Sequence, residues 1–402
     1  MPDEDCSGSD EDHWGKGCRL LFVVNETYFF YSHRLPVARA ALKAGFEVHV
    51  AGPEDHVWAP DSFGAEILAD EGFIYHKLPL NRRGVNPFQD SKTIWALLKL
   101  HLRLRPSLVH HLTIKPVLYG GIIARLFKNC GVLNAITGLG HVFSATNLKS
   151  VILRKLIEQL YNLSLAGKNS LVVVQNQEDG EQLTRIGATS KDRINLIRGS
   201  GVSMDEYSPS AEPDGPPLVI LPARLIWAKG VDEFVRAARQ LKLEGIPARF
   251  ALLGSAKNNY PGAVSELQLR QWVDEGCIEW WGYQEDMRDV YRNSHIVCLP
   301  TSYGEGIPRV LIEAAACGRP VVTTDVAGCR DIVEDGLNGL LVSPGDHDAL
   351  VDALRQLLTD RELRLRFGQA GRNHVELGFS ESVIVGQTLD IYRQLLPGVA
   401  KG

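Results

Sequence analysis

The feature that most limits how this chain can fold is an alternation of short apolar runs with longer amphipathic stretches. The first half begins with CRLLFVVN (18–25), continues with RLPVARAALKAG (34–45), and returns to an apolar run at FEVHVAGP (46–53). Continuous apolar runs of this length predict buried strands, whereas apolar residues at helical spacing before a glycine predict a helix. Strand–helix–strand units form a parallel sheet with helices on both faces. The sequence therefore predicts an α/β fold.

The alternation stops near residue 202 and starts again after a break. The break, 203–217, contains four prolines, a composition that favours an interdomain linker. Strand-like runs lie before it at 107–112, 132–140, 171–177 and 194–202, and after it at 218–224, 249–255, 278–283, 295–301 and 320–325. The predicted organisation is an acidic disordered tail (1–16), an N-terminal domain (17–202), the linker (203–217), a second domain (218–380), and a last helix (381–402) that packs back on the first domain.

Two domains also suit the length of the chain, because 402 residues are too many for one ordinary core. Each half predicts a doubly wound, Rossmann-like sheet. Ligands of such sheets bind at the carboxyl ends of the strands, so the expected site is a cleft between two facing domains.

Composition excludes several classes of protein. No apolar run reaches 18 residues, so no membrane-spanning helix is expected, and the acidic N-terminus is unlike a secretory signal. The seven cysteines are scattered without a C-x-x-C pair, which argues against a disulfide framework or a structural zinc site and favours a cytoplasmic protein.

Charge is distributed unevenly along the chain. Residues 15–200 hold 23 Lys and Arg against 14 Asp and Glu, a balance of +9, whereas residues 201–402 have a balance of −8. A basic first half suits a phosphate-bearing partner or a membrane surface, and an ordinary fluctuation in charge is the alternative. Nothing in the sequence indicates a nucleic-acid partner.

Candidate ligand contacts of the second domain follow its predicted strands. Arg224 follows the first strand, and Lys229 precedes the next helix, so the two cations and the helix N-terminus could clamp a diphosphate. Two solvated surface cations are the alternative. Gly282 also follows a strand, where it could let a flat ring lie against the backbone or simply form a turn.

The stretch YGEGIPRVLIEAAACGRPVV (303–322) holds Glu305 and Glu313 eight positions apart. Glu305 lies in a predicted loop, and Glu313 lies inside a helix beginning near Pro308, about 7–8 Å further along its axis. Two carboxylates so arranged cannot act as an acid/base pair on one bond, but they could hold distant hydroxyl groups of one extended ligand. The amides of Gly306, Ile307 and the first helical turn could bind a diphosphate between them. A buried Glu313 with a local partner is the alternative.

These stretches together resemble a known family. PARLIWAKG, then GYQEDM, then PTSYGEGIPRVLIEAAACGRPVVTTDVAGCRD resemble the nucleotide-sugar domain of family-4 retaining glycosyltransferases, which have the GT-B fold. The resemblance implies that Arg224 and Lys229 hold the donor diphosphate, that Glu305 contacts the donor sugar, and that Glu313 contacts the ribose. The remaining donor-side candidates are Gly282, Tyr283, Gly306, Ile307 and Arg309. The sequence departs from the family where Ile307-Pro308 replaces a frequent Phe-Gly pair.

The first domain would then bind the acceptor. NETYFFYSHR (25–34) and VHHLTIKPVLYGG (109–121) resemble a bacterial subgroup that assembles O-antigen, capsule and lipid-linked glycans, including N-acetylgalactosaminyltransferases acting on undecaprenyl-diphosphate-linked bacillosamine. Many relatives have a glycine-rich loop where this chain has NETYFFYSHR, which would bring His33 and Arg34 near the cleft. The other candidates are His111 and Lys115 after a strand, Thr137 where relatives have a sugar-contacting histidine, and the nearby His141. A satisfied core histidine is the alternative for His111.

The resulting hypothesis is a retaining glycosyltransferase that moves a hexose or N-acetylhexosamine from a nucleotide diphosphate sugar, with uridine favoured, to a polyprenyl-diphosphate-linked saccharide. No D-x-D motif follows a strand, so no metal or other cofactor is expected. A nucleotide-sugar epimerase or hydrolase and a non-catalytic nucleotide-sugar-binding subunit are the alternatives. The basic amphipathic stretches 93–106 and 147–163 could contact the cytoplasmic membrane peripherally, or simply pack on the sheet.

Overall fold

The computed structural model describes residues 13–54, 66–81, 86–139, 148–256, 262–304 and 306–396. The chain divides into two compact units. The first unit runs to Ile197 and includes the chain again from Ile384, and the second unit is Arg198–Val383. The chain therefore changes unit just before the proline-rich segment 203–217, which lies in the second unit.

The first unit is built on a seven-stranded parallel sheet of order β3-β2-β1-β4-β5-β6-β7. Its elements are β1 (Arg19–Val24), α1 (Thr27–Lys43), β2 (Glu47–Gly52), α2 (Glu66–Asp70), β3 (Ile74–Lys77), α3 (Pro87–Leu104), β4 (Leu108–Leu112), the π-helical turn η2 (Pro116–Gly120), α4 (Gly121–Ala124), β5 (Gly131–Ile136), α6 (Leu148–Leu165), β6 (Ser170–Val174), α7 (Gln177–Arg185), η3 (Lys191–Arg193), β7 (Ile194–Leu196) and α15 (Glu381–Leu395).

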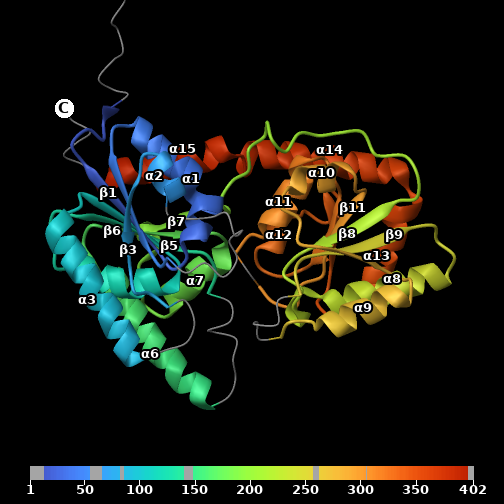
Figure 1. Ribbon diagram of the computed structural model, residues 1–402, viewed down its shortest axis with the longest axis horizontal. Coiled ribbons are helices and arrows are strands. Elements are labelled where there is room, and N and C mark those ends of the chain that lie inside the picture. Colours follow the sequence, from blue (N-terminus) through green and yellow to red (C-terminus); the bar gives the residue numbers. More distant parts are fainter. Residues whose placement is uncertain are drawn as a thin grey trace, which may run out of the picture. The chain divides into compact units, whose positions relative to one another are not determined.

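Alternation along the strands explains why helices cover both faces of this sheet. In β1, Leu20 and Phe22 point to one face and pack with α1 and α15, whereas Leu21 and Val23 point to the other and pack with α3. Figure 1 shows α1 and α15 on one side of the first sheet and α3 on the other. An apolar run without polar interruptions is what a strand buried on both faces requires.

The second unit repeats this architecture with a six-stranded parallel sheet of order β10-β9-β8-β11-β12-β13. Its elements are β8 (Leu218–Pro222), η4 (Trp227–Lys229), α8 (Val231–Leu243), β9 (Arg249–Leu253), α9 (Glu266–Asp274), β10 (Glu279–Gly282), α10 (Met287–Arg292), β11 (Ile296–Leu299), α11 (Arg309–Ala316), β12 (Val321–Thr324), α12 (Cys329–Ile332), β13 (Gly339–Val342), α13 (His347–Thr359) and α14 (Arg361–Gly378). Val219 and Leu221 face α8, α9 and α13, whereas Leu218 and Ile220 face α10, α11 and α12.

Both sheets follow the strand order 3-2-1-4-5-6 of doubly wound folds, with a seventh strand added to the first sheet. The prediction of two Rossmann-like α/β domains is thereby confirmed. The order also fixes a switch point in each sheet, between β1 and β4 and between β8 and β11, where connections leave in opposite directions. None of the described helices combines the length and apolarity needed to cross a bilayer.

One local prediction was wrong. The sequence suggested a helix from residue 34, preceded by a loop, but α1 already begins at Thr27 and contains Pro36. A proline inside a helix cannot donate a hydrogen bond to the preceding turn, and its ring crowds the carbonyl four residues back. Pro36 therefore weakens the helix locally, whereas the apolar face of Phe30 and Leu35, buried on the sheet, stabilises its first turns.

Candidate functional site

The switch point of the second sheet brings two loops together. The loop after β8 leads through η4 into α8, and the loop after β11 leads into α11. The carbonyl of Ala228, in η4, accepts hydrogen bonds from the amide of Ser302 at 2.9 Å and from the hydroxyl of Thr301 at 3.1 Å. Two segments about 70 residues apart in sequence are thus joined at the carboxyl edge of the sheet, where doubly wound folds bind ligands.

Lys229 lies at the centre of this junction. Lys229 is only 6% exposed, and its ammonium group lies 5.6 Å from the centre of the Tyr303 ring. Gly230 then turns the chain into α8 with φ at +75°, and a Cβ atom there would lie 2.0 Å from the carbonyl oxygen of Pro300. A side chain at position 230 would therefore push the two loops apart.

The other cation and the glycine turns border the same edge. Arg224 is exposed in the loop directly after β8. Gly254 follows β9, and its amide donates to the carbonyl of Gly282 at 2.8 Å, so the ends of β9 and β10 are held together. Gly282 has φ at +70°, and Tyr283 after it is 55% exposed. Arg224 and Gly282 therefore lie at strand ends of one sheet edge, and Lys229 lies in η4, just before α8.

The loop after β11 contains the candidate donor contacts. Pro308 forms the N-cap of α11, which begins at Arg309, one residue later than the sequence suggested. The Ile307 side chain packs in the core, so only its backbone could face a ligand, whereas Gly306 is partly exposed. Glu305 lies outside the described residues.

Glu313 is the central residue of a buried hydrogen-bonded cluster. Its Oε1 accepts from the Tyr207 hydroxyl at 3.0 Å and from Nε of Arg309 at 2.7 Å, and its Oε2 accepts from the Tyr291 hydroxyl at 2.9 Å. Burial and the Glu313 carboxylate hold the pKa of Tyr291 well above its usual value, so this phenol stays protonated and donates. Burial alone would lower the pKa of Arg309, but the Glu313 carboxylate raises it.

A carboxylate offers about four acceptor positions, two on each oxygen. In the described contacts Oε1 uses two positions and Oε2 uses one. Glu313 is therefore a buried helix residue with partners within the protein, one of the two alternatives that the sequence left open, and its contact with a ligand stays a prediction.

Among the described candidates of the first unit, Arg34 and His111 are buried, whereas His33, Lys115 and Thr137 are only partly buried. His33 and Arg34 lie in α1, where His33 stacks on the Phe29 ring at 4.4 Å between ring centres. Arg34 is 4% exposed, and burial lowers its pKa to about 10, an effect that Tyr392 partly offsets. Residues 27–43 are helical, so both residues lie on a helix and not in a loop after β1, and their place near a cleft stays a prediction.

His111 is a core histidine. It is fully buried in β4, its Nδ1 lies 2.8 Å from Oδ1 of Asn134, and Nε2 has no hydrogen-bond partner among the described residues. Burial lowers its pKa to about 3, so the ring is neutral at physiological pH. The ring lies against Gly120, where a Cβ atom would come within 2.2 Å of Nε2.

Lys115 lies just beyond β4 and is largely buried. It forms an ion pair with Asp90 of α3, with 2.8 Å between Nζ and Oδ1. The other carboxylate oxygen of Asp90 accepts from the amide of Asn86 at the start of α3. Thr137 is half-buried directly after β5, and His141 lies outside the described residues. The structure therefore does not bring the first-unit candidates together as an exposed cluster.

Sequence reasoning missed the partners of two candidates. Tyr207 and Tyr291 lie 106 and 22 residues from Glu313, and Asp90 lies 25 residues from Lys115. Of these partners, only Arg309 could have been predicted from the sequence. It lies four residues before Glu313 on the same helix, and side chains at this spacing meet on a helix surface. Among the described residues, no group of three or more His, Cys, Asp or Glu side chains is placed to hold a metal ion.

Comparison with known proteins agrees with this division into two halves. Residues 19–176 match the family described as Glycosyl transferase 4-like, and residues 204–374 match the family described as Glycosyl transferases group 1. The chain is a glycosyltransferase. It is 26% identical over 394 residues to the N,N'-diacetylbacillosaminyl-diphospho-undecaprenol alpha-1,3-N-acetylgalactosaminyltransferase of Campylobacter jejuni, covering 95% of this chain and 100% of that protein.

Two solved structures show that this glycosyltransferase has the fold of its structural neighbours. The sucrose-phosphate synthase of Thermosynechococcus elongatus superimposes with a TM-score of 0.78 at 21% identity, over 94% of this chain and 99% of that chain. HepE of Anabaena, in complex with UDP, superimposes with a TM-score of 0.73 at 17% identity, over 94% of this chain and 100% of that chain. The predicted GT-B class is confirmed.

Proposed function

We propose that this glycosyltransferase moves a hexose or N-acetylhexosamine from a nucleotide diphosphate sugar to a saccharide carried on a polyprenyl diphosphate, with retention at the anomeric carbon and without a metal ion. The observation that carries the proposal is the switch point of the second unit. Arg224 and Lys229 lie on the segment between β8 and α8, which is hydrogen-bonded through Ala228 to the loop between β11 and α11. A uridine nucleotide is supported by HepE, whose structure contains UDP, and the acceptor by the name of the Campylobacter jejuni relative.

In this proposal, each group of the second unit has one task. Arg224 and Lys229 stabilise the negative charge that develops on the departing diphosphate, and the amides at the start of α11 assist them. Oε2 of Glu313 accepts a hydrogen bond from a ribose hydroxyl, and Glu305 contacts the donor sugar.

Bond changes balance without a further reactant. The bond from the anomeric carbon to the diphosphate oxygen breaks, and a bond to the acceptor oxygen forms on the same face of the sugar. The acceptor hydroxyl gives its proton to the departing diphosphate. The six described cysteines are all buried free thiols, in keeping with action in the cytoplasm.

The test is a donor screen in which uridine and guanosine diphosphate sugars are incubated with undecaprenyl-diphosphate saccharides and released nucleotide is measured. We expect turnover that requires both substrates and that has the same rate in EDTA. The new glycosidic bond of the product, examined by NMR, should have the anomeric configuration of the donor. Complete release of nucleotide without acceptor would instead indicate a hydrolase, and conversion of the donor sugar without release of nucleotide would indicate an epimerase.

Variants connect this activity to the switch point. Lys229→Ala should lower kcat by about 10²–10³-fold, the typical effect of removing one preorganised group that stabilises developing charge. Arg236→Ala is the matched control, because Arg236 is an exposed cation on α8 of the same unit. Equal activity of the Lys229→Ala and Arg236→Ala variants would favour a different diphosphate site.

A further inference from the structure

The segment 203–217 is held on the second unit by arginines, although its composition resembles a linker. Nη1 of Arg372, on α14, donates to the carbonyl of Tyr207 at 2.6 Å and to the carbonyl of Ala316, the last residue of α11, at 2.9 Å. The guanidinium offers several N–H donors in a rigid fork, so one side chain can join two elements. Tyr207 is therefore fixed to the helix that carries Glu313.

The second phenol of the Glu313 cluster is held in a similar way. Arg319 is only 2% exposed, and its Nε donates to the carbonyl of Tyr291 at 2.9 Å. Nη2 of Arg319 donates to the hydroxyl of Ser210 at 2.5 Å, so the same arginine also reaches the segment 203–217. Both residues whose hydroxyl groups bind Glu313 thus have their own backbone held by an arginine.

Two phenols fix the plane of the Glu313 carboxylate. The last torsion of a glutamate side chain is broad, so covalent geometry does not decide where the two oxygens point. Tyr207 donates to Oε1 at 3.0 Å and Tyr291 donates to Oε2 at 2.9 Å, so the carboxylate is held at both oxygens. Arg309, which pairs with Oε1 at 2.7 Å, already compensates the charge. The phenols therefore add direction to the carboxylate more than they add neutralisation.

This arrangement bears on how Glu313 would meet a ligand. Each carboxylate oxygen accepts about two hydrogen bonds, and in the described contacts Oε2 accepts one. The Glu313 side chain is 8% exposed. Because the phenols set the plane of the carboxylate, the second acceptor position of Oε2 has one fixed direction.

We propose that Tyr207 is a positioning residue of the donor site. Its hydrogen bond to Oε1 turns Oε2 of Glu313 toward a ribose hydroxyl of the nucleotide, and Arg372 keeps Tyr207 in place. The inference rests on the proposed function, which assigns the ribose to Glu313. Without the phenol, the carboxylate can turn toward Arg309 and carry Oε2 away from the ribose. The segment 203–217 is accordingly part of the donor site and not only a spacer between domains.

A cycle of two proteins and two ligands tests the inference. The ligands are UDP and its 2′,3′-dideoxy analogue, with GDP and its dideoxy analogue in parallel, and calorimetry measures their Kd values. The wild-type chain should bind the ribonucleotide about ten- to a hundredfold more tightly than the analogue, the value of a hydrogen bond to a charged group. Tyr207→Phe should weaken binding of the ribonucleotide about tenfold and leave binding of the analogue within about twofold.

Steady-state kinetics separate this positioning role from a part in the chemistry. The ribose lies away from the bond that breaks, so its contact stabilises ground state and transition state equally. Tyr207→Phe should therefore raise the donor KM about tenfold and leave kcat within about twofold, in contrast to Lys229→Ala. The melting temperature shows that the variant remains folded.

Tyr161→Phe is the matched control for Tyr207→Phe. It removes a fully buried hydroxyl from α6 of the first unit, and this hydroxyl has no hydrogen-bond partner among the described residues. Tyr161→Phe should bind the ribonucleotide and the analogue as the wild type does.

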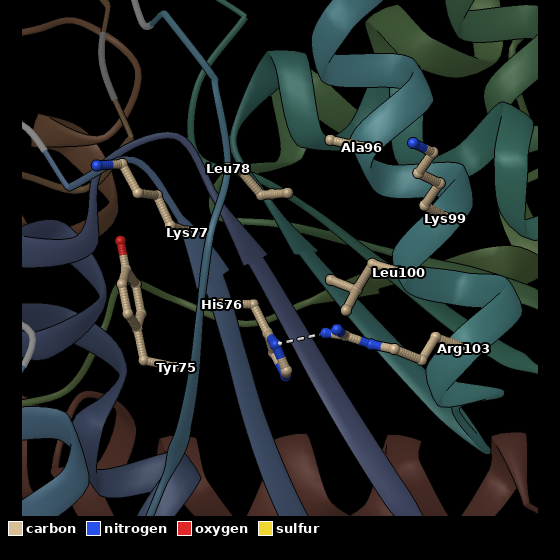
Figure 2. A pocket seen from close by; sticks show the side chains of 8 residues that line it. All are labelled: Tyr75, His76, Lys77, Leu78, Ala96, Lys99, Leu100 and Arg103. Atoms are coloured by element: carbon tan, nitrogen blue, oxygen red, sulfur yellow. Dashed lines mark hydrogen bonds between the residues drawn. The ribbon is translucent and has the colours of Figure 1, made fainter.

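A second pair of variants tests the arginine. Arg372→Met should weaken ribonucleotide binding as Tyr207→Phe does, and the double variant should lose little more, because the arginine acts through the phenol. Arg103→Met is the control. Arg103 lies in the first unit, in an open crevice of about 540 Å³ between β3 and α3, and Figure 2 shows its guanidinium beside His76, with 3.3 Å between Nη2 and Nδ1. This variant should keep the wild-type affinity for the nucleotide.

The cycle separates a failure of this inference from a failure of the proposed function. Equal weakening of both ligands by Tyr207→Phe would overturn the inference, because Tyr207 would then support only the fold. Unchanged or tighter binding of the ribonucleotide by the folded variant would overturn it as well. If the wild-type chain bound both ribonucleotides no better than their dideoxy analogues, the ribose contact of Glu313 in the proposed function would itself be wrong.

Discussion

The cluster around Glu313 gives the sharpest test of the second unit. Glu313→Ala removes the acceptor of two buried phenols and the partner of Arg309. A buried donor left unsatisfied costs about 1–3 kcal/mol. Tyr291 is fully buried and Tyr207 is 9% exposed, so both hydroxyls lose their acceptor in the interior. A water can enter the space left by the carboxylate and accept from them, so we expect a cost in the lower half of that range, about 1–2 kcal/mol, for each phenol.

Arg309 adds a smaller amount to this loss. Its side chain is 30% exposed, so water replaces part of what the carboxylate supplied, and we assign about 1 kcal/mol to it. The sum is about 3–5 kcal/mol, which agrees with the usual cost of breaking a buried charge pair. A domain of about 150–250 residues changes its Tm by roughly 2–4 °C for each kcal/mol, so the transition of the second unit should fall by roughly 10 °C.

Differential scanning calorimetry of the full chain is the appropriate assay, because it separates the transitions of two domains. Glu362→Ala, which removes an exposed glutamate from the first turn of α14, is the matched control and should shift Tm by only about 2 °C. A double-mutant cycle with Tyr291→Phe should show a coupling of about 0.5–3 kcal/mol. If Glu313→Ala melted like Glu362→Ala, or if the cycle showed no coupling, the cluster would not stabilise the second unit.

Two further predictions concern the loop junction and the first unit. Gly230→Ala should destabilise the second unit by about 2–4 kcal/mol, because position 230 has a positive φ and a Cβ atom there would meet the Pro300 carbonyl. The control Gly245→Ala, with φ at +76° and open space around it, should cost only about 1 kcal/mol. Equal losses of unfolding free energy in urea would argue against the close approach at position 230. His111 has a folded pKa of about 3 against about 6.5 when unfolded, so the unfolded state takes up the proton first and stability falls as pH drops below about 6.5. Between pH 7 and pH 5 the protein should lose about 2 kcal/mol of unfolding free energy through His111. The His111→Gln variant should lose about 2 kcal/mol less over the same pH range, which urea unfolding at both pH values measures.

The sheets could be predicted from the sequence because their signal is local. The run 18–25 contains β1 (Arg19–Val24), 107–112 contains β4 (Leu108–Leu112), and 218–224 contains β8 (Leu218–Pro222). A strand buried on both faces is mostly apolar, so its approximate bounds can be read from the chain itself. The start of α1 could not be read in this way, because it depends on the packing of Phe30 and Leu35 against the sheet.

The contacts of the site were only partly predictable. The loop ends of β8 and β11 follow from strand order, because a doubly wound sheet places its first and fourth strands side by side. The tyrosines that bind Glu313 do not follow from any local pattern. A phenol 106 residues away reaches the carboxylate only because the segment after residue 203 packs against α10 and α11, and nothing in its composition, which resembles a linker, indicates this.

The two switch points differ in a way that bears on where each unit meets an anion. In the second unit an exposed arginine follows β8. In the first unit the corresponding candidates cannot offer their charge: Arg34 is buried, His111 is neutral, and Lys115 is paired with Asp90. Among the described residues of this unit, the exposed face of α3 is one place where several cations face solvent together. Among the described candidates of the first unit, none therefore presents an exposed cation at the strand ends, whereas in the second unit Arg224 does so directly after β8.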